Sequence, residues 1–496
     1  MVLMSSNALP DSRLPAGAIS AYLVACAFLA IIQVVWAEAL SGDDFETLNL
    51  FVPVLLALSS VLLVWQVVRQ HPLAIWNPLV WFLLACTMYY GLGQLIHLFG
   101  TPDSIRRVNQ LYKVDQPGLA RTNFLHTVGV IIIVGVYAIA STLFKQQQRT
   151  LPADGALAIE RRSIQEARVS SILFLSVGLP IKYLLELPAN LGLLTWILPG
   201  SIKYLGTLSG VAIIPLYWLY KKQGGMYRPL FLALVISEFL VSVVSLSKLE
   251  MVKTALFLVL AMQLVKPGLK KLALSGITIV VVYVFVASPF VTFARVALDR
   301  FAATNLLQVV EVWEQYNAQG RTVRDVEYPN AQLWWTRLAY SNVELFAMRQ
   351  YDQGHPGTTF ALAPYTLIPR FIVPDKPIMT TGLSFTQLIT GDRTMMSFTG
   401  LGVLGEGYWN AGWLGVAGVG VVVGVFLAAF SQFSARIVED RRFVFLPISM
   451  AGIIMGLRID DWFVPTYLGF GVQLLLIYLM LQYVVRPIAF GKAVGV

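Results

Sequence analysis

The sequence predicts an all-α, polytopic integral membrane protein with about twelve transmembrane helices. Hydrophobic residues make up 57% of the 496 residues and charged residues 13%, whereas a soluble domain averages about 25% charged residues. The mean hydropathy is +0.70. Several apolar runs, such as 17–39 and 77–99, hold the roughly 20 residues that a helix needs to cross a bilayer.

Apolar periodicity and length place the individual spans along the chain. We expect twelve of them, at residues 17–39, 48–68, 77–99, 123–144, 169–186, 201–220, 229–247, 251–265, 272–294, 411–432, 443–457 and 465–485. The segment 187–200, which is apolar but contains two prolines, is expected to be an interfacial or re-entrant piece.

The charges of the short connections predict the orientation. Basic connections at 69–76, 145–168, 221–228, 266–271 and 434–442 alternate with connections poor in Lys and Arg, such as 41–48. Cytoplasmic loops carry an excess of Lys and Arg. Both termini are therefore expected in the cytoplasm, which agrees with an even number of spans.

This orientation divides the chain into three parts. Residues 1–294 hold spans one to nine, residues 295–410 form a large extracytoplasmic loop, and residues 411–496 hold spans ten to twelve. A loop of this length is usually functional or disordered. Its many aromatic residues predict an ordered, partly helical segment, and the apolar stretch 331–350 predicts one amphipathic or half-buried helix.

Composition also argues against several classes of protein. The net charge of +9 is spread over connections between apolar spans, so nucleic-acid binding is not expected. Cys26 and Cys86 both lie inside apolar runs, which disfavours a disulfide framework or a Cys-based metal site. The outer segments contain no metal-ligand spacing, and the chain contains neither a P-loop nor a G-x-S-x-G motif. We expect no metal and no cofactor.

Arginine dominates the basic residues of the expected outer face. Guanidinium groups bind phosphate oxygens through two parallel hydrogen bonds, so this bias favours a phosphate or diphosphate ligand, with solvation or lipid-headgroup contact as the alternative for any single residue. The candidate phosphate-binding residues are Arg295, Arg337, Arg370, Arg393, Arg458, Lys248 and Lys376.

Three residues are candidates for a general base. Glu406 lies at the outer mouth of a glycine-rich run at 400–424, next to Tyr408 and Asn410, and a carboxylate near hydrocarbon is costly without a role. Asp392 and His355 are the other candidates, although the GHPG sequence around His355 is equally typical of a turn. The glycines themselves are expected to let membrane helices pack closely.

Three stretches then carry a resemblance. LIPRFIVPDKP (367–377), GEGYWNAGWLG (405–415) and SLSKLEMVKTALFLVL (245–260) resemble parts of bacterial oligosaccharide repeat-unit polymerases. These are the O-antigen, capsule and exopolysaccharide polymerases of the flippase-dependent pathway. The resemblance covers spans seven to twelve, about half of the chain.

The resemblance implies a GT-C-like glycosyltransferase of the bacterial inner membrane. It would transfer a glycan from one undecaprenyl diphosphate to a sugar hydroxyl of a second lipid-linked unit on the extracytoplasmic face. Lipid-linked oligosaccharides and membrane lipid are the expected partners, with a chain-length regulator and a flippase as further ones.

The resemblance further implies that Arg370 and Lys376 hold the diphosphate, helped by Arg295 and Lys248. Three prolines in 367–377 would stiffen the chain that carries the first two. Glu406 would be the base or a ligand of the substrate hydroxyl, with Asp392 and His355 next. The sugar-contacting candidates are Trp334, Trp335, Tyr408 and Asn410.

Two other functions fit the sequence as well. A transporter or flippase of lipid-linked sugars also has many spans, although transporters tend to have repeated halves and charges at mid-depth in the membrane. An O-antigen ligase, or another transferase acting on lipid-linked glycans, shares the chemistry of the polymerase.

Overall fold

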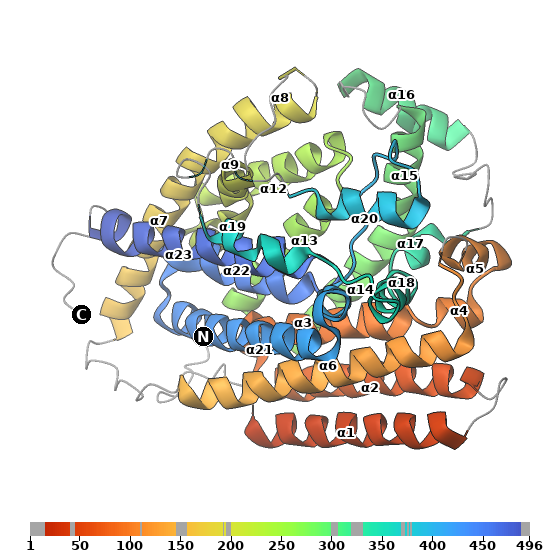
Figure 1. The fold of residues 1–496 in the computed structure, drawn as a ribbon. Helices are drawn as coiled ribbons and strands as arrows, with labels where there is room; N and C mark the ends of the chain where they lie inside the picture. The colour runs from red at the N-terminus through yellow and green to blue at the C-terminus, as the bar shows by residue number, and fades with distance from the viewer. Residues whose placement is uncertain are drawn as a thin grey trace.

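A computed structural model describes residues 15–39, 45–109, 112–144, 156–191, 193–194, 200–298, 306–318, 331–368, 373, 376 and 379–487. Figure 1 shows this chain as an assembly of helices. Over these ranges the regular structure is helical and contains no strand. The prediction of an all-α protein is therefore confirmed.

Nine helices of the described residues are long and apolar enough to cross a membrane, which confirms a polytopic membrane protein. They are Ala16–Ala39 (α1), Phe45–Gln70 (α2), Pro78–Phe99 (α3, η3 and α4), Gln116–Leu143 (α6), Glu160–Asn190 (within α7, η4 and α8), Ile202–Gln223 (within α9 to α11), Tyr227–Val244 (α12), Leu269–Arg295 (α14, η5 and most of α15) and Val403–Asp440 (α21).

The other three expected spans also coincide with helices. They are Lys248–Val265 (α13), the shorter apolar helix Phe443–Leu457 (η7 and α22), and the segment formed by Val464–Gly469 (η8), Phe470–Met480 (α23) and Leu481–Val485 (η9). The remaining component helices are Pro72–Trp76 (η2), Pro78–Cys86 (α3), Thr87–Leu92 (η3), Ile96–Phe99 (α4), Pro102–Asn109 (α5), Ala156–Pro180 (α7), Ile181–Glu186 (η4), Leu187–Asn190 (α8), Gly200–Gly206 (α9), Leu208–Val211 (α10), Ile213–Gln223 (α11), Leu269–Val282 (α14), Tyr283–Ala287 (η5), Ser288–Ala297 (α15) and Leu446–Leu457 (α22).

Helices α1, α2, α6 and α21 form one packed group, which lies in the lower part of Figure 1. Two glycines of α21 allow close contact with α6. A Cβ at Gly424 would lie 2.7 Å from the Ile133 carbonyl oxygen, and one at Gly420 would lie 2.6 Å from a side-chain carbon of Ile132. At these two positions the glycine-rich run has the close-packing role expected of small residues.

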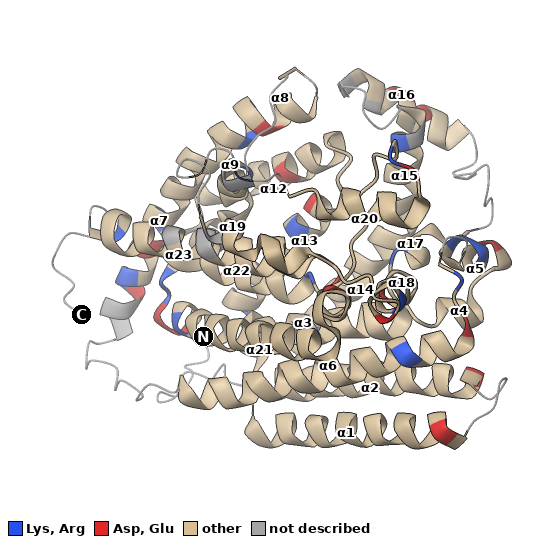
Figure 2. Cartoon of the chain, viewed as in Figure 1, with Lys and Arg blue, Asp and Glu red and all other residues tan. Residues whose placement is uncertain are grey.

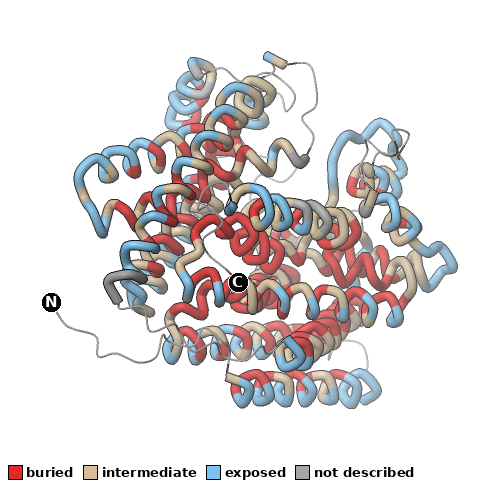
Figure 3. The backbone as a smooth tube through the Cα atoms, turned by 90° about the vertical axis from the view of Figure 1, so that its left-hand side faces the viewer, coloured by how far each residue is buried: buried red, intermediate tan, exposed pale blue. Residues whose placement is uncertain are grey.

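A second packed group is formed by α7, α10, α11, α12 and α13. Helix α22 joins the two groups, because it packs on α3 and α21 and also contacts α10. Figure 3 shows buried residues gathered on the inward faces of the helices, while exposed residues cover the outward faces. Figure 2 shows that charged residues lie mostly near helix ends and in connections.

Helix α21 begins at Val403 and contains a break. Ala411 has φ −151° and Gly412 has φ +59°, so neither is helical. A left-handed φ favours glycine, and a Cβ at position 412 would also lie 2.9 Å from the Tyr351 ring. The expected span at 411–432 thus begins at a kink, and residues 403–410 form a separate helical segment before it.

The expected extracytoplasmic loop holds several short helices: Leu306–Ala318 (α16), Leu333–Thr336 (α17), Ser341–Asp352 (α18), Thr359–Leu362 (η6), Ala363–Leu367 (α19) and Thr381–Thr390 (α20). Its partly helical character is confirmed. The single helix expected at 331–350 is instead two, α17 and α18, separated by Arg337–Tyr340. Helix α18 packs on both α6 and α21, so this part of the loop belongs to the helical core.

Candidate functional site

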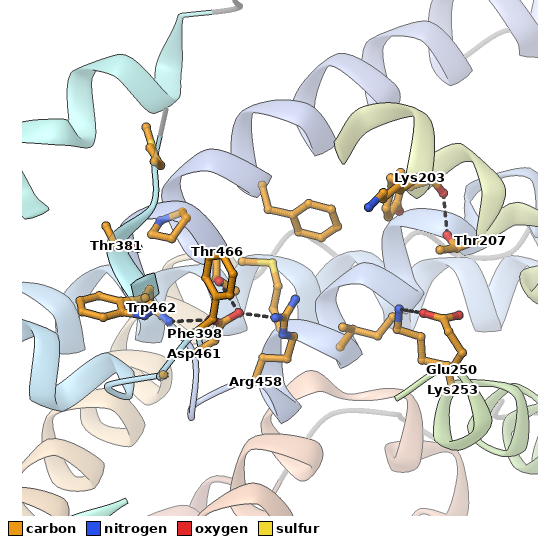
Figure 4. A pocket seen from close by; sticks show the side chains of 18 of the residues that line it. Lys203, Thr207, Glu250, Lys253, Thr381, Phe398, Arg458, Asp461, Trp462 and Thr466 are labelled. Atoms are coloured by element: carbon orange, nitrogen blue, oxygen red, sulfur yellow. Dashed lines mark hydrogen bonds and ion pairs between the residues drawn. The ribbon is translucent and has the colours of Figure 1, made fainter. Parts of the chain in front are cut away.

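A pocket of about 560 Å³ lies where four parts of the chain meet (Figure 4). Its walls come from Glu186 and residues 203–207, from Glu250 and Lys253 in the first two turns of α13, from residues 379–400 and from residues 454–470. Most of these wall segments belong to connections, or to span ends, that are expected on the extracytoplasmic side. The pocket therefore gathers wall segments from one expected side of the membrane.

One part of the pocket is charged. Lys203, Lys253 and Arg458 supply three cations to its lining. The Nζ of Lys253 lies 2.7 Å from Oε1 of Glu250, while Arg458 forms an ion pair with Asp461. Figure 4 shows Glu250 and Lys253 on one side of the pocket, and Arg458 with Asp461 nearer its middle.

Another part of the lining is apolar or aromatic. It includes Trp462, Phe398, Tyr204, Met455 and Phe470. The Trp462 indole N–H donates a 3.0 Å hydrogen bond to the Thr399 carbonyl oxygen, which fixes the ring. The pocket thus combines cations with a large apolar surface, an arrangement that suits an amphipathic anion.

Two π-helices border this pocket. Segment η4 ends at Glu186, and η8 contributes Pro465 and Thr466. Short π-helical segments inside α-helices are frequent at functional sites because they re-aim side chains. The Thr466 hydroxyl donates a 2.8 Å hydrogen bond to Oδ2 of Asp461, so η8 also holds the acid that pairs with Arg458.

Three of the expected phosphate-binding residues lie close together near this pocket. The Nζ of Lys248 donates to the hydroxyl oxygens of Ser288 (3.0 Å) and Thr292 (2.8 Å) on α15. Lys248 also lies within electrostatic range of Arg295 and Arg337. All three cations are expected on one face of the membrane, and in the structure Arg295 and Arg337 lie within electrostatic range of Lys248.

Asp460 connects this cation cluster with Arg458. It interacts electrostatically with Arg458, and with Tyr283, which in turn interacts with Arg337. Burial, together with the neighbouring Asp461 carboxylate, raises the pKa of Asp460 above its ordinary value. The Tyr340 hydroxyl donates a 3.2 Å hydrogen bond to its Oδ2.

Two other expected cations that the structure describes, Lys376 and Arg393, do not line the pocket. Arg370, the fourth residue of LIPRFIVPDKP, lies outside the described residues. The Nζ of Lys376 donates a 3.1 Å hydrogen bond to the carbonyl oxygen of Ile368, eight residues earlier in the chain. Arg393 is exposed in the turn after α20. Of the six expected phosphate-binding residues that the structure describes, Arg458 is the one that lines the pocket.

Glu406 is fully buried and its carboxylate is occupied by protein groups. Oε1 accepts a 2.6 Å hydrogen bond from the Thr359 hydroxyl, and Oε2 accepts from the backbone N–H groups of Phe463 and Val464. It therefore holds the start of η8. Asn410 also belongs to this network, since its side-chain amide donates a 2.7 Å hydrogen bond to the Thr359 hydroxyl oxygen.

The other two candidate bases are exposed. Asp392 accepts hydrogen bonds from the backbone N–H (2.8 Å) and hydroxyl (2.7 Å) of Thr394, which hold the pKa of its carboxyl below the ordinary value. His355 lies in the expected GHPG turn, where its backbone N–H donates to the Gln350 carbonyl oxygen at the end of α18. Neither residue lines the pocket.

The expected sugar-contacting residues make contacts within the protein. The rings of Trp334 and Trp335 stack on each other at 5.6 Å between centroids, and the Trp335 indole donates to the Leu92 carbonyl oxygen. Arg121 donates a 2.6 Å hydrogen bond to the Tyr408 hydroxyl, which donates in turn to Asp352.

Sequence reasoning missed several charged residues. Lys203 and Glu186 line the pocket but lie within or at the end of expected spans, where we sought no site. Two buried pairs were also missed: His126 with Glu344, and Lys182 with Glu238, each at 2.5 Å. The available signal was a charged residue inside an apolar span, which is costly unless it is paired or functional.

No protein-family model, curated protein or solved structure matches this chain.

Proposed function

We propose that this protein polymerises oligosaccharide repeat units that are linked to undecaprenyl diphosphate. It would be a GT-C-like glycosyltransferase of the bacterial inner membrane, with both termini in the cytoplasm and the reaction on the extracytoplasmic face. The observation that supports it best is the pocket of about 560 Å³, in which three cations lie beside an apolar and aromatic surface.

The ligand chemistry follows from that lining. Lys203, Lys253 and Arg458 complement a diphosphate, because ammonium and guanidinium groups form charge-assisted hydrogen bonds with phosphate oxygens. Phe398 is 68% exposed and offers an aromatic face on which a sugar ring can stack, and Thr381 and Thr466 offer hydroxyl groups. A lipid diphosphate that carries a glycan has all three kinds of group.

The same cations favour the transfer itself. When the bond from the anomeric carbon to the phosphate oxygen breaks, negative charge develops on the departing lipid diphosphate. Preorganised cations stabilise that charge more in the transition state than in the ground state. Lys248, Arg295 and Arg337 add positive charge near the pocket and would help to hold a lipid-linked substrate.

Purified protein in liposomes or detergent, supplied with undecaprenyl-diphosphate-linked repeat units, tests the proposal. We expect a ladder of products that differ by one repeat unit, together with released undecaprenyl diphosphate. A lipid-A core acceptor in a parallel reaction distinguishes the ligase. Glycan transfer to that acceptor, without a ladder on the carrier lipid, would replace the polymerase with a ligase.

One observation favours transport as a second candidate function. The buried pairs His126–Glu344 and Lys182–Glu238 place charged groups inside the helical assembly, as transporters often do. The test is flipping of a fluorescent lipid-linked glycan in proteoliposomes. Protein-dependent flipping without ladders would establish the transporter and contradict the polymerase.

A further inference from the structure

Glu186 differs from the other carboxylates of the pocket in its bonding. Glu250 accepts a hydrogen bond from Lys253, and Asp461 is engaged by Arg458, Thr466 and the backbone N–H of Trp462. Glu186 lines the same pocket but forms no hydrogen bond or ion pair with any residue that the structure describes. Its carboxylate is therefore open to a ligand.

The backbone places this carboxylate at the pocket wall. Glu186 is the last residue of the π-helix η4, and it is only partly exposed. Its Oε2 lies over Gly206 of α9, where a Cβ would approach it to 2.7 Å. The glycine thus leaves the space that the carboxylate occupies between η4 and α9.

Charged neighbours surround the group. Four charged side chains lie within electrostatic range of the Glu186 carboxylate: the cations Lys182, Lys203 and Lys253, and the carboxylate of Glu250. Two of these lysines, Lys203 and Lys253, line the pocket themselves. A free carboxylate beside cations, in a partly enclosed site, has the features of a general base.

We infer that Glu186 is the general base of the glycosyl transfer, an inference that rests on the proposed function. The acceptor sugar hydroxyl oxygen forms a bond with the anomeric carbon of the donor, and the bond from that carbon to the phosphate oxygen breaks. The electron pair of that bond leaves with the lipid diphosphate. The hydroxyl proton passes to the Glu186 carboxylate, from which water removes it.

Three variants of the full chain test this role in the ladder assay. Glu186→Gln keeps the size of the side chain but cannot accept the proton, so we expect the rate of ladder formation to fall about 100-fold or more. Glu186→Asp keeps a carboxylate and should retain more activity than the glutamine variant. Glu160→Gln is the matched control, since Glu160 is half exposed and pairs with Lys222 at a connection far from the pocket.

Two further measurements separate catalysis from structure. Binding of undecaprenyl diphosphate should change less than threefold in Glu186→Gln, and the acid limb of the pH–rate profile should disappear. Unchanged activity, or loss of activity in parallel with binding, would overturn the inference. A wild-type protein that forms no ladder would instead refute the proposed function, and the base assignment with it.

Discussion

His126 and Glu344 form a hydrogen-bonded pair of 2.5 Å between Nε2 and Oε2, with both side chains fully buried. They are 218 residues apart in sequence and join α6 to α18. The Tyr90 ring stacks on the imidazole at 3.9 Å between centroids. This contact fixes a helix of the expected extracytoplasmic loop to a helix of the membrane-spanning group.

Replacing Glu344 with alanine should strongly destabilise the protein. The substitution leaves His126 without its partner in a site that no solvent reaches, and breaking a buried pair costs about 3–5 kcal/mol. Unfolding in mixed detergent micelles measures the loss. Glu314→Ala is the control, because Glu314 lies exposed on α16. Equal stability of the two variants would contradict a structural role for the pair.

The pair of Lys182 and Glu238 allows a sharper test by a double-mutant cycle. Both side chains are almost fully buried, and they join η4 to α12. Lys182→Met alone leaves the Glu238 carboxylate unpaired and should cost about 3 kcal/mol. Lys182→Met combined with Glu238→Leu removes both charges and should recover most of that loss. If the loss of stability in the double variant equals the sum of the losses in Lys182→Met and Glu238→Leu alone, the two residues do not stabilise each other.

Hydropathy predicted the helical elements well, because each expected span lies on a helix of the described residues. It could not predict the break between α17 and α18. There Leu338 and Ala339 are buried, and Trp335 bonds to the carbonyl oxygen of Leu92, 243 residues away in sequence. These tertiary contacts outweigh the local helical pattern of the stretch.

The pocket was less accessible to sequence reasoning for a related reason. The sequence suggested Glu406 as a catalytic base near the hydrocarbon. Its carboxylate instead accepts hydrogen bonds from the backbone N–H groups of Phe463 and Val464, which lie 57 and 58 positions further along the chain. Lys203 and Glu186 looked like isolated charges in apolar runs. Only the packing of η4, α9, α13 and η8 shows that they share a pocket.

Glu406→Gln should distinguish a capping carboxylate from a catalytic one. The amide oxygen can still accept one of the present hydrogen bonds, so we expect a loss of about 1–3 kcal/mol of stability from the weakened contacts to η8. Because the buried group has no free oxygen for a substrate, ladder formation should stay within tenfold of wild type. A loss above 100-fold in a stably folded variant would restore Glu406 as the candidate base.

Arg458→Ala should weaken the binding of undecaprenyl diphosphate. Hydrogen bonds to charged groups contribute about 1.5–3 kcal/mol each, so the expected increase in Kd is about 10- to 100-fold. Arg458→Lys keeps the charge but cannot form bidentate hydrogen bonds with a phosphate. Its Kd should lie between those of Arg458→Ala and wild type. Arg228→Ala, at the exposed start of α12 and outside the pocket lining, is the control. Unchanged binding by Arg458→Ala would remove this pocket as the diphosphate site.

The pH dependence of stability gives a last test, on Asp460. Burial, together with the Asp461 carboxylate, raises its pKa in the folded state above the ordinary value of 3.8. The protonated carboxyl therefore contributes stability that is fully present below pH 3.8 and is lost as the pH rises through the raised pKa. Asp460→Asn stays neutral and keeps an acceptor for the Tyr340 hydroxyl. We expect its stability relative to wild type to increase with pH across that window and then to level off.

Asp392→Asn should behave in the opposite way, which makes it a matched comparison. Hydrogen bonds from Thr394 lower the pKa of Asp392, so its carboxylate contributes stability that is present above pH 3.8 and is lost as the pH falls through the lowered pKa. The stability of Asp392→Asn relative to wild type should therefore decrease as the pH rises through the region below 3.8. Thermal unfolding of wild type and both variants over a pH series measures the two slopes. Slopes of the same sign would contradict the buried environment of Asp460, because an exposed and a buried aspartate would then titrate alike.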